Sequence, residues 1–168
     1  MTAVVASALV RTCGCGGWTG TWFARQGAVF HVAVRPGVTV AVSAGPADAG
    51  AGRQVTLHAG DFGERYAFAP GARPFGPHPL LEAAIESVGA PAGMTIDVRV
   101  GSAVPHGAST GTSAAVCVAL AGALRAPAGA SLDPDDVARA AHGVEVERLG
   151  GESGQQVVRH DRAGGAGR

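Results

Sequence analysis

The sequence predicts an α+β fold in which helices cover one face of a mostly antiparallel or mixed β-sheet. Three observations support this class. Most strand-like runs lie in the first half of the chain, the two strongest helical patterns lie in the last third, and a loop rich in Gly, Ser and Thr joins the last strand to the first of these helices. A length of 168 residues suits one domain. Hydrophobic residues make up 46% of the chain and aromatic residues only 5%, so we expect a core of Val, Ala and Leu.

Strands are predicted mainly in the first half, where β-branched and apolar runs are bounded by Gly, Pro or charged residues. The tripeptide Arg35-Pro36-Gly37 separates two of these runs and predicts a tight hairpin turn. A glycine-rich stretch with two Trp, residues 11–22, predicts tight turns or the close approach of a ligand, with the two Trp lining a pocket; the alternative is a plain flexible loop. The predicted strands are residues 4–10, 29–34, 38–42 and 54–57, with 61–68 as an edge strand and 44–52 as a loop.

The second half alternates a rigid loop, helices and one strand. Four prolines stiffen residues 70–79, and apolar residues at helical spacing predict a helix over 80–88 that stops at Gly89. Residues 94–100 alternate as a strand. Residues 113–124 are apolar nearly all round, which predicts a buried helix. Asp133 and Pro134 are typical of the N-cap and first position of a last helix, which we expect to reach about residue 149.

The loop over residues 104–112 has the composition of an anion-binding site. The first N–H groups of a helix have no partner inside it, and the helix dipole is positive there. Small residues let a phosphate approach the backbone, and hydroxyl groups can reach its oxygens or a bound Mg²⁺. The alternative is a plain helix cap and turn. The chain contains no Lys, and Gly107 and Gly111 do not form a glycine triplet, so neither a Walker A loop nor a dinucleotide fingerprint is present.

Charge and cysteine content exclude several functional classes. Thirteen basic residues balance thirteen acidic ones, so nothing predicts binding to nucleic acid or to an anionic membrane surface. No apolar run is long enough to cross a bilayer. Three cysteines, an odd number, argue against a disulfide framework and fit a reducing compartment, so we expect a cytoplasmic protein.

Three motifs in order resemble those of a known enzyme family. Residues 11–21 resemble a substrate motif in which an Arg is followed by Gly-Gly-Trp-Thr-Asp-Thr. Residues 105–115 resemble a nucleotide loop, and residues 145–156 resemble a helix and loop that carry a metal-binding Glu and end in Gly-x-Gln-Asp. Together they are similar to the N-terminal half of the GHMP kinases, the family of galactokinase, homoserine kinase and mevalonate kinase. Within it, they look most like bacterial sugar kinases of the heptose and fucose type.

The resemblance implies a ribosomal protein S5 domain 2-like fold over residues 1–156, with ATP and Mg²⁺ as cofactors. It also implies transfer of the γ-phosphoryl group to a hydroxyl of a sugar or sugar phosphate. Ser113 together with Glu147, or else Glu145, would hold the metal. The substrate motif would contribute Arg11, Gly17, Trp18 and Thr19. The nucleotide loop would contribute Pro105, Gly107, Ala108, Ser109, Gly111, Thr112, Ser113 and Ala114.

The chain departs from the family pattern at all three motifs. Gly20 stands where the substrate motif has Asp, and Ser109-Thr110 stands where the nucleotide loop has Gly-Leu. A Ser tolerates a positive φ angle less readily than Gly, so we expect Ser109 to hinder the approach of phosphate. Val157 occupies the position of the catalytic Asp, so no catalytic residue is assigned.

Residues 157–168 change to Arg, Gly and Ala without periodicity, which predicts a disordered, aberrant tail. We interpret this change as the mark of a frameshifted or decayed gene that lacks the C-terminal kinase domain. The leading hypothesis is therefore a truncated, inactive sugar kinase. The alternatives are a nucleotide- or sugar-binding module, half of a split kinase completed by another polypeptide, and an S5-like scaffold without a ligand. Uncovered apolar surface would favour self-association.

Overall fold

The computed structural model describes residues 2–16, 28–47, 53–89, 93–105, 107–126 and 133–149. Gly17, Trp18, Thr19 and Val157 lie outside the described residues, as does the tail predicted over residues 157–168. The domain boundary proposed at residue 156 also falls there and stays a prediction.

Five strands form one mixed sheet in the order β1-β2-β5-β3-β4. Neighbouring strands are antiparallel except β3 and β5, which run parallel. The predicted α+β class is confirmed, and β4 forms the edge strand expected within residues 61–68. The strands are β1 Thr2–Cys15, β2 Phe30–Pro46, β3 Gln54–Ala59, β4 Glu64–Phe68 and β5 Met94–Ser102, with a short 3₁₀ turn, η1, at Gly60–Phe62.

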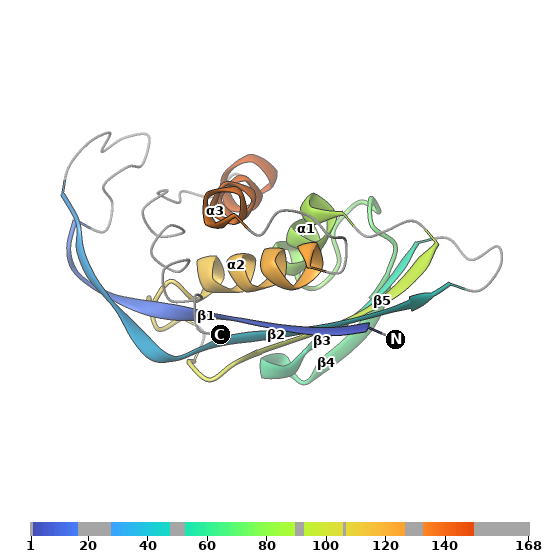
Figure 1. Cartoon of the computed structure of the whole chain (residues 1–168), viewed down its shortest axis with the longest axis horizontal. Helices are drawn as coiled ribbons and strands as arrows, with labels where there is room; N and C mark the ends of the chain where they lie inside the picture. The colour runs from blue at the N-terminus through green and yellow to red at the C-terminus, as the bar shows by residue number, and fades with distance from the viewer. Residues whose placement is uncertain are drawn as a thin grey trace.

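The helices stack on one face of this sheet in two layers (Figure 1). Helix α2, Thr112–Arg125, lies directly against β1 and β2, and α1, Pro79–Val88, packs beside it. Helix α3, Pro134–Gly143, lies on the other side of α2 and continues into a π-helical segment, η2, at Val144–Arg148. Because α2 is enclosed between the sheet and α3, its apolar residues face protein on nearly every side, as its sequence predicts.

The hairpin predicted at Arg35-Pro36-Gly37 is wrong, because β2 runs through these residues as one strand. Ala8 pairs with Val38 and Val10 pairs with Val34, so three residues of β2 lie opposite a single residue of β1 in a bulge. Residues in a bulge are not paired in the ladder, so the lack of an N–H on Pro36 removes no hydrogen bond between the strands. A Cβ on Gly37 would lie 2.2 Å from the carbonyl oxygen of Ala8, so the bulge requires glycine there.

Residues 11–15 also differ from the prediction, since they extend β1 instead of forming a loop. They pair with residues 30–33 of β2, although a register irregularity at Gly14 interrupts the ladder. Residues 44–46, predicted as part of a loop, likewise belong to β2 and pair with β5. Glycine has a low propensity for strands, but pairing with β2 and β5 supplies backbone hydrogen bonds that outweigh this local preference. As a result Arg11 sits on a strand, which fixes its position.

The core confirms the expected composition. The largest fully buried side chains are all aliphatic, and they come from the sheet, from α1 and α2, and from the start of η2. Across the described part of the chain, no helix is both long enough and apolar enough to cross a membrane. The best-buried large residues are Leu57, Ile85, Leu120, Val10, Val38, Val40, Val42, Val55, Val98 and Val144.

Candidate functional site

The loop between β5 and α2 winds through three left-handed backbone positions. Gly107, Ser109 and Gly111 have φ angles of +79°, +54° and +72°. Glycine adopts such angles freely, whereas Ser109 is the one non-glycine residue with a positive φ in the described part of the chain. Ser109 therefore adopts a left-handed backbone conformation at a cost in local strain.

Helix α2 begins without a side-chain cap. Its N-cap is Gly111, and its first helical hydrogen bond runs from the N–H of Ala115 to the carbonyl of Gly111 at 3.1 Å. The N–H groups of Thr112, Ser113 and Ala114 precede this bond, so no carbonyl within the helix accepts from them. The hydroxyl groups of Thr110 and Thr112 are hydrogen-bonded to each other at 3.0 Å. The positive end of α2 thus carries N–H donors and hydroxyl groups but no acidic side chain.

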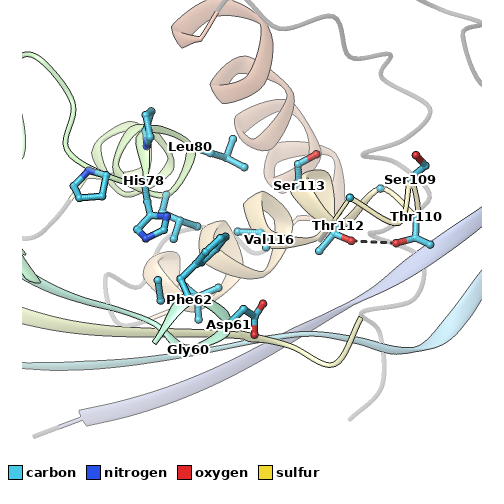
Figure 2. A pocket seen from close by; sticks show the side chains of 17 residues that line it. Gly60, Asp61, Phe62, His78, Leu80, Ser109, Thr110, Thr112, Ser113 and Val116 are labelled. Carbon is cyan, nitrogen blue, oxygen red and sulfur yellow. Dashed lines mark hydrogen bonds between the residues drawn. The ribbon is translucent and has the colours of Figure 1, made fainter. Parts of the chain in front are cut away.

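A cavity of about 480 Å³ opens beside this helix terminus, between the N-termini of α1 and α2 and the η1 turn (Figure 2). One end is polar and is built by the loop and the first residues of α2. The other end is apolar and contains Phe62, Leu80 and Val116, with the ring of His78 beside them. From the loop and α2, the lining residues are Gly107, Ser109, Thr110, Gly111, Thr112, Ser113 and Val116.

A network of rings and carboxylates holds the apolar end in place. The rings of Phe62 and His78 lie 4.7 Å apart between centroids, and the His78 Nε2 is 3.0 Å from Glu64 Oε2. Buried Glu82 accepts hydrogen bonds from the Tyr66 hydroxyl at 2.6 Å and from the N–H of Gly76 at 2.9 Å. Burial raises the pKa of Tyr66 and the bond to Glu82 adds to this, so the phenol stays a donor. The start of α1 is therefore tied to β4 and to the proline-rich loop.

Arg11 reaches the nucleotide-type loop from the edge of the sheet. Its N–H donates to the carbonyl oxygen of Thr110 at 2.8 Å. Its side chain crosses the α2 terminus so closely that a Cβ on Gly111 would lie 3.2 Å from Arg11 Nε. That Nε is buried without a hydrogen-bond partner among the described residues. Burial lowers the pKa of His31, two residues from the β2 partner of Arg11, and the charge of Arg11 lowers it further.

The structure brings together some of the predicted site residues and separates others. Gly107, Ser109, Gly111, Thr112 and Ser113 line the cavity, with Arg11 over Gly111. Neither Pro105 nor Ala108 lines it, and Ala114 is buried in the core. Glu147 is exposed on η2 and Glu145 is buried, and neither lines the cavity. Within the described ranges, no three acidic, histidine or cysteine side chains gather closely enough to hold a metal ion.

Neither the place of Thr110 in the cavity nor the apolar end of the cavity was predicted from the sequence. Asp61 and Phe62 directly follow β3, and His78 precedes the first residue of α1. The run Pro77-His78-Pro79 predicts a rigid start for the helix that follows. No local sequence pattern, however, predicts that this run lies beside a loop thirty residues later in the chain.

Comparison with known proteins gives one family match, which covers part of the chain. Residues 79–158 match the family model for the GHMP kinases N terminal domain, a span that contains α1, β5, the loop, α2 and α3. A search of curated proteins gave no match.

Solved structures share the fold across almost the whole chain. Mevalonate kinase from Methanococcus jannaschii is 14% identical with a TM-score of 0.72, over 95% of this chain and 52% of that one. A D-glycero-D-manno-heptose 1-phosphate kinase from Bacteroides thetaiotaomicron is 17% identical with a TM-score of 0.77, over 98% and 54%. Streptococcus pneumoniae phosphomevalonate kinase, in complex with phosphomevalonate and AMPPNP, is 15% identical with a TM-score of 0.67, over 97% and 47%.

At these identities the structural likeness shows the fold, and this chain spans about half the length of the kinases it matches. The fold agrees with the ribosomal protein S5 domain 2-like architecture implied by the resemblance. The family match over residues 79–158 and the shared fold agree with the predicted resemblance to the N-terminal half of the GHMP kinases.

Proposed function

We propose that this chain binds ATP as the nucleotide-binding part of a small-molecule kinase. One observation carries the proposal: the uncapped, positive end of α2 opens into a cavity whose far end is apolar. A nucleotide has the matching polarity, with a charged phosphate chain at one end and a flat, weakly polar base at the other. The structurally similar phosphomevalonate kinase was solved with AMPPNP, an ATP analogue, which supports the same class of ligand here.

The phosphate end of the site is assigned to backbone groups. The free N–H groups at the start of α2 would donate to phosphate oxygens, and Arg11 would add a positive charge beside Gly111. Mg²⁺ would neutralise the part of the negative charge on the phosphates that the positive side chains do not neutralise. Since neither Glu145 nor Glu147 lines the cavity, Ser113 is the residue best placed to bind the metal through its hydroxyl.

For the whole kinase, we propose phosphoryl transfer to a hydroxyl of a sugar or sugar phosphate, with the acceptor on the Arg11 side of the loop. The similar structures include a heptose 1-phosphate kinase and a galactokinase complexed with galactose, which supports this acceptor class. Val157 stands at the position expected for the catalytic Asp. We therefore propose that this chain binds ATP but does not catalyse transfer by itself. A complementing C-terminal half would supply the catalytic groups.

Titration calorimetry with ATP and Mg²⁺ tests the proposal. We expect saturable binding to one site, and we expect Ser113→Ala to weaken it about tenfold, as for the loss of one hydrogen bond to a charged group. Ser7→Ala, an exposed hydroxyl on β1, is the matched control and should leave binding unchanged. Absence of binding to the folded chain would contradict the proposal and favour an unliganded scaffold. Phosphorylation of a sugar by the purified chain would contradict its non-catalytic part.

A further inference from the structure

Asp61 is a carboxylate inside a cavity whose polar end is suited to anions. It lines the cavity from the η1 turn, directly after β3. Figure 2 shows its side chain on the sheet side of the cavity, between Phe62 and Thr112. The side chain thus lies where the apolar end passes into the phosphate-type loop.

The Asp61 carboxylate is held in one orientation. Its two oxygens accept from the N–H of Ser102 at 3.0 and 3.1 Å. The hydroxyl of Ser102 in turn donates to the carbonyl of Val104 at 2.8 Å and accepts from the Val104 N–H at 3.0 Å. Asp61 is therefore coupled to the strand end from which the loop departs. A carboxylate has about four acceptor positions, so one shared N–H leaves acceptor capacity on both oxygens.

The chemistry of this position favours a neutral donor. The negative charge of Asp61 would repel a phosphate placed next to it. An aromatic base would be stabilised more by packing against Phe62 and Leu80 than by contact with this carboxylate. A hydroxyl group, in contrast, can donate a charge-assisted hydrogen bond to a fixed carboxylate. In a nucleotide, the hydroxyl-bearing ribose lies between the base and the phosphates, as Asp61 lies between the two ends of the cavity.

We infer that Asp61 accepts hydrogen bonds from the ribose hydroxyls of the nucleotide and so selects ribonucleotides over deoxyribonucleotides. The inference rests on the proposed binding of ATP and adds a specificity residue to that site. Asp61 acts here in binding, with no part in bond formation or cleavage.

The test compares the affinities of the full chain for ATP, 2′-deoxy-ATP and 3′-deoxy-ATP by titration calorimetry. We expect ATP to bind at least about tenfold more tightly than one of the deoxynucleotides, because a hydrogen bond to a charged group is lost. In Asp61→Ala this preference should fall to about one. Asp61→Asn keeps an acceptor for the Ser102 N–H and should show a reduced preference with an unchanged melting temperature.

Asp136→Asn is the matched control, since it removes an exposed carboxylate that pairs with Arg139 on α3, away from the cavity. It should keep the full preference for ATP. If no nucleotide binds, the proposed function fails. If ATP binds but the native chain binds deoxynucleotides equally well, or Asp61→Ala keeps the native preference, only the ribose assignment fails. A loss of ATP affinity in Asp61→Ala that disappears when Mg²⁺ is chelated would assign Asp61 to the metal and overturn it.

Discussion

Helices α2 and α3 begin in opposite ways. At α3, the carboxylate of Asp133 accepts from the N–H groups of Asp135 and Asp136 at 2.9 and 3.4 Å, and both of these residues add negative charge to the first turn. At α2, the N-cap is Gly111 in a left-handed conformation, with no side-chain cap and no acidic residue in the first turn. The two helices pack against each other, but only the N-terminus of α2 lines the cavity.

The N-termini of α2 and α3 thus differ in how their unpaired N–H groups are satisfied. Unpaired N–H groups and a positive dipole end favour a nearby negative charge. Helix α3 supplies that charge from its own sequence, which stabilises the helix. Helix α2 has no such charge in its first turn, and its N-terminus opens onto a cavity. The absence of a cap on α2 is thus consistent with a terminus that an anionic ligand completes.

The largest effect is expected from giving α2 the negative charge that α3 has. Ser113→Asp should lower ATP affinity by at least about a hundredfold, because like charges placed together cost several kcal/mol. The free chain should gain about 0.3–1 kcal/mol from the favourable interaction with the helix dipole. Calorimetry with ATP and thermal unfolding without it measure the two effects. Ser113→Asn is the control, because Asn is similar in size to Asp but carries no charge. An unchanged ATP affinity in Ser113→Asp would contradict the proposed difference in function between the two helix N-termini.

A second prediction concerns the close approach of Arg11 to the α2 terminus. Gly111 and Gly63 share a left-handed backbone, with φ and ψ of 72° and 27° against 65° and 20°. A Cβ at Gly63 meets nothing within 4 Å, whereas at Gly111 it would lie 3.2 Å from Arg11 Nε. Gly63→Ala should therefore cost about 1 kcal/mol of unfolding free energy for backbone strain alone. Gly111→Ala should cost about 2 kcal/mol, because Arg11 must also move.

Urea unfolding of both variants and of the native chain measures this difference. Equal losses in the two variants would show that Arg11 does not constrain the loop. A larger loss at Gly63 would be incompatible with the packing described for the α2 terminus.

The smallest effect is expected at the capped helix. Asp133→Ala should lower the free energy of unfolding by about 1 kcal/mol, the usual value for loss of an N-cap side chain. Asp133→Asn retains an acceptor oxygen and should stay close to the native value. ATP affinity should be unchanged in both variants, since α3 does not line the cavity. A loss of affinity in Asp133→Ala comparable to that of Ser113→Ala would mean that the two termini are not separate in function.

The sequence predicted the elements whose signals are local. The prolines and Gly89 around α1, the all-apolar pattern of α2, and the pair Asp133-Pro134 at the start of α3 each correspond to observed structure. Most residues of the loop from Gly107 to Ser113 line the cavity, while anion binding by this loop stays a prediction. The helix predictions succeed because capping and helical periodicity depend on residues within one or two turns.

Pairings between distant segments were decided only by the tertiary structure. Pro36 and Gly37 have the local composition of a turn, yet the pairing of β2 with β1 on one side and β5 on the other carries the strand through them as a bulge. The apolar end of the cavity joins Phe62 and His78 to Val116 across more than fifty residues of chain. Sequence by itself therefore determined the fold class, the resemblance to a kinase family and the place of the polar loop. Only the packing of the sheet against α1 and α2 decided the cavity beside that loop, because packing depends on contacts that no local pattern encodes.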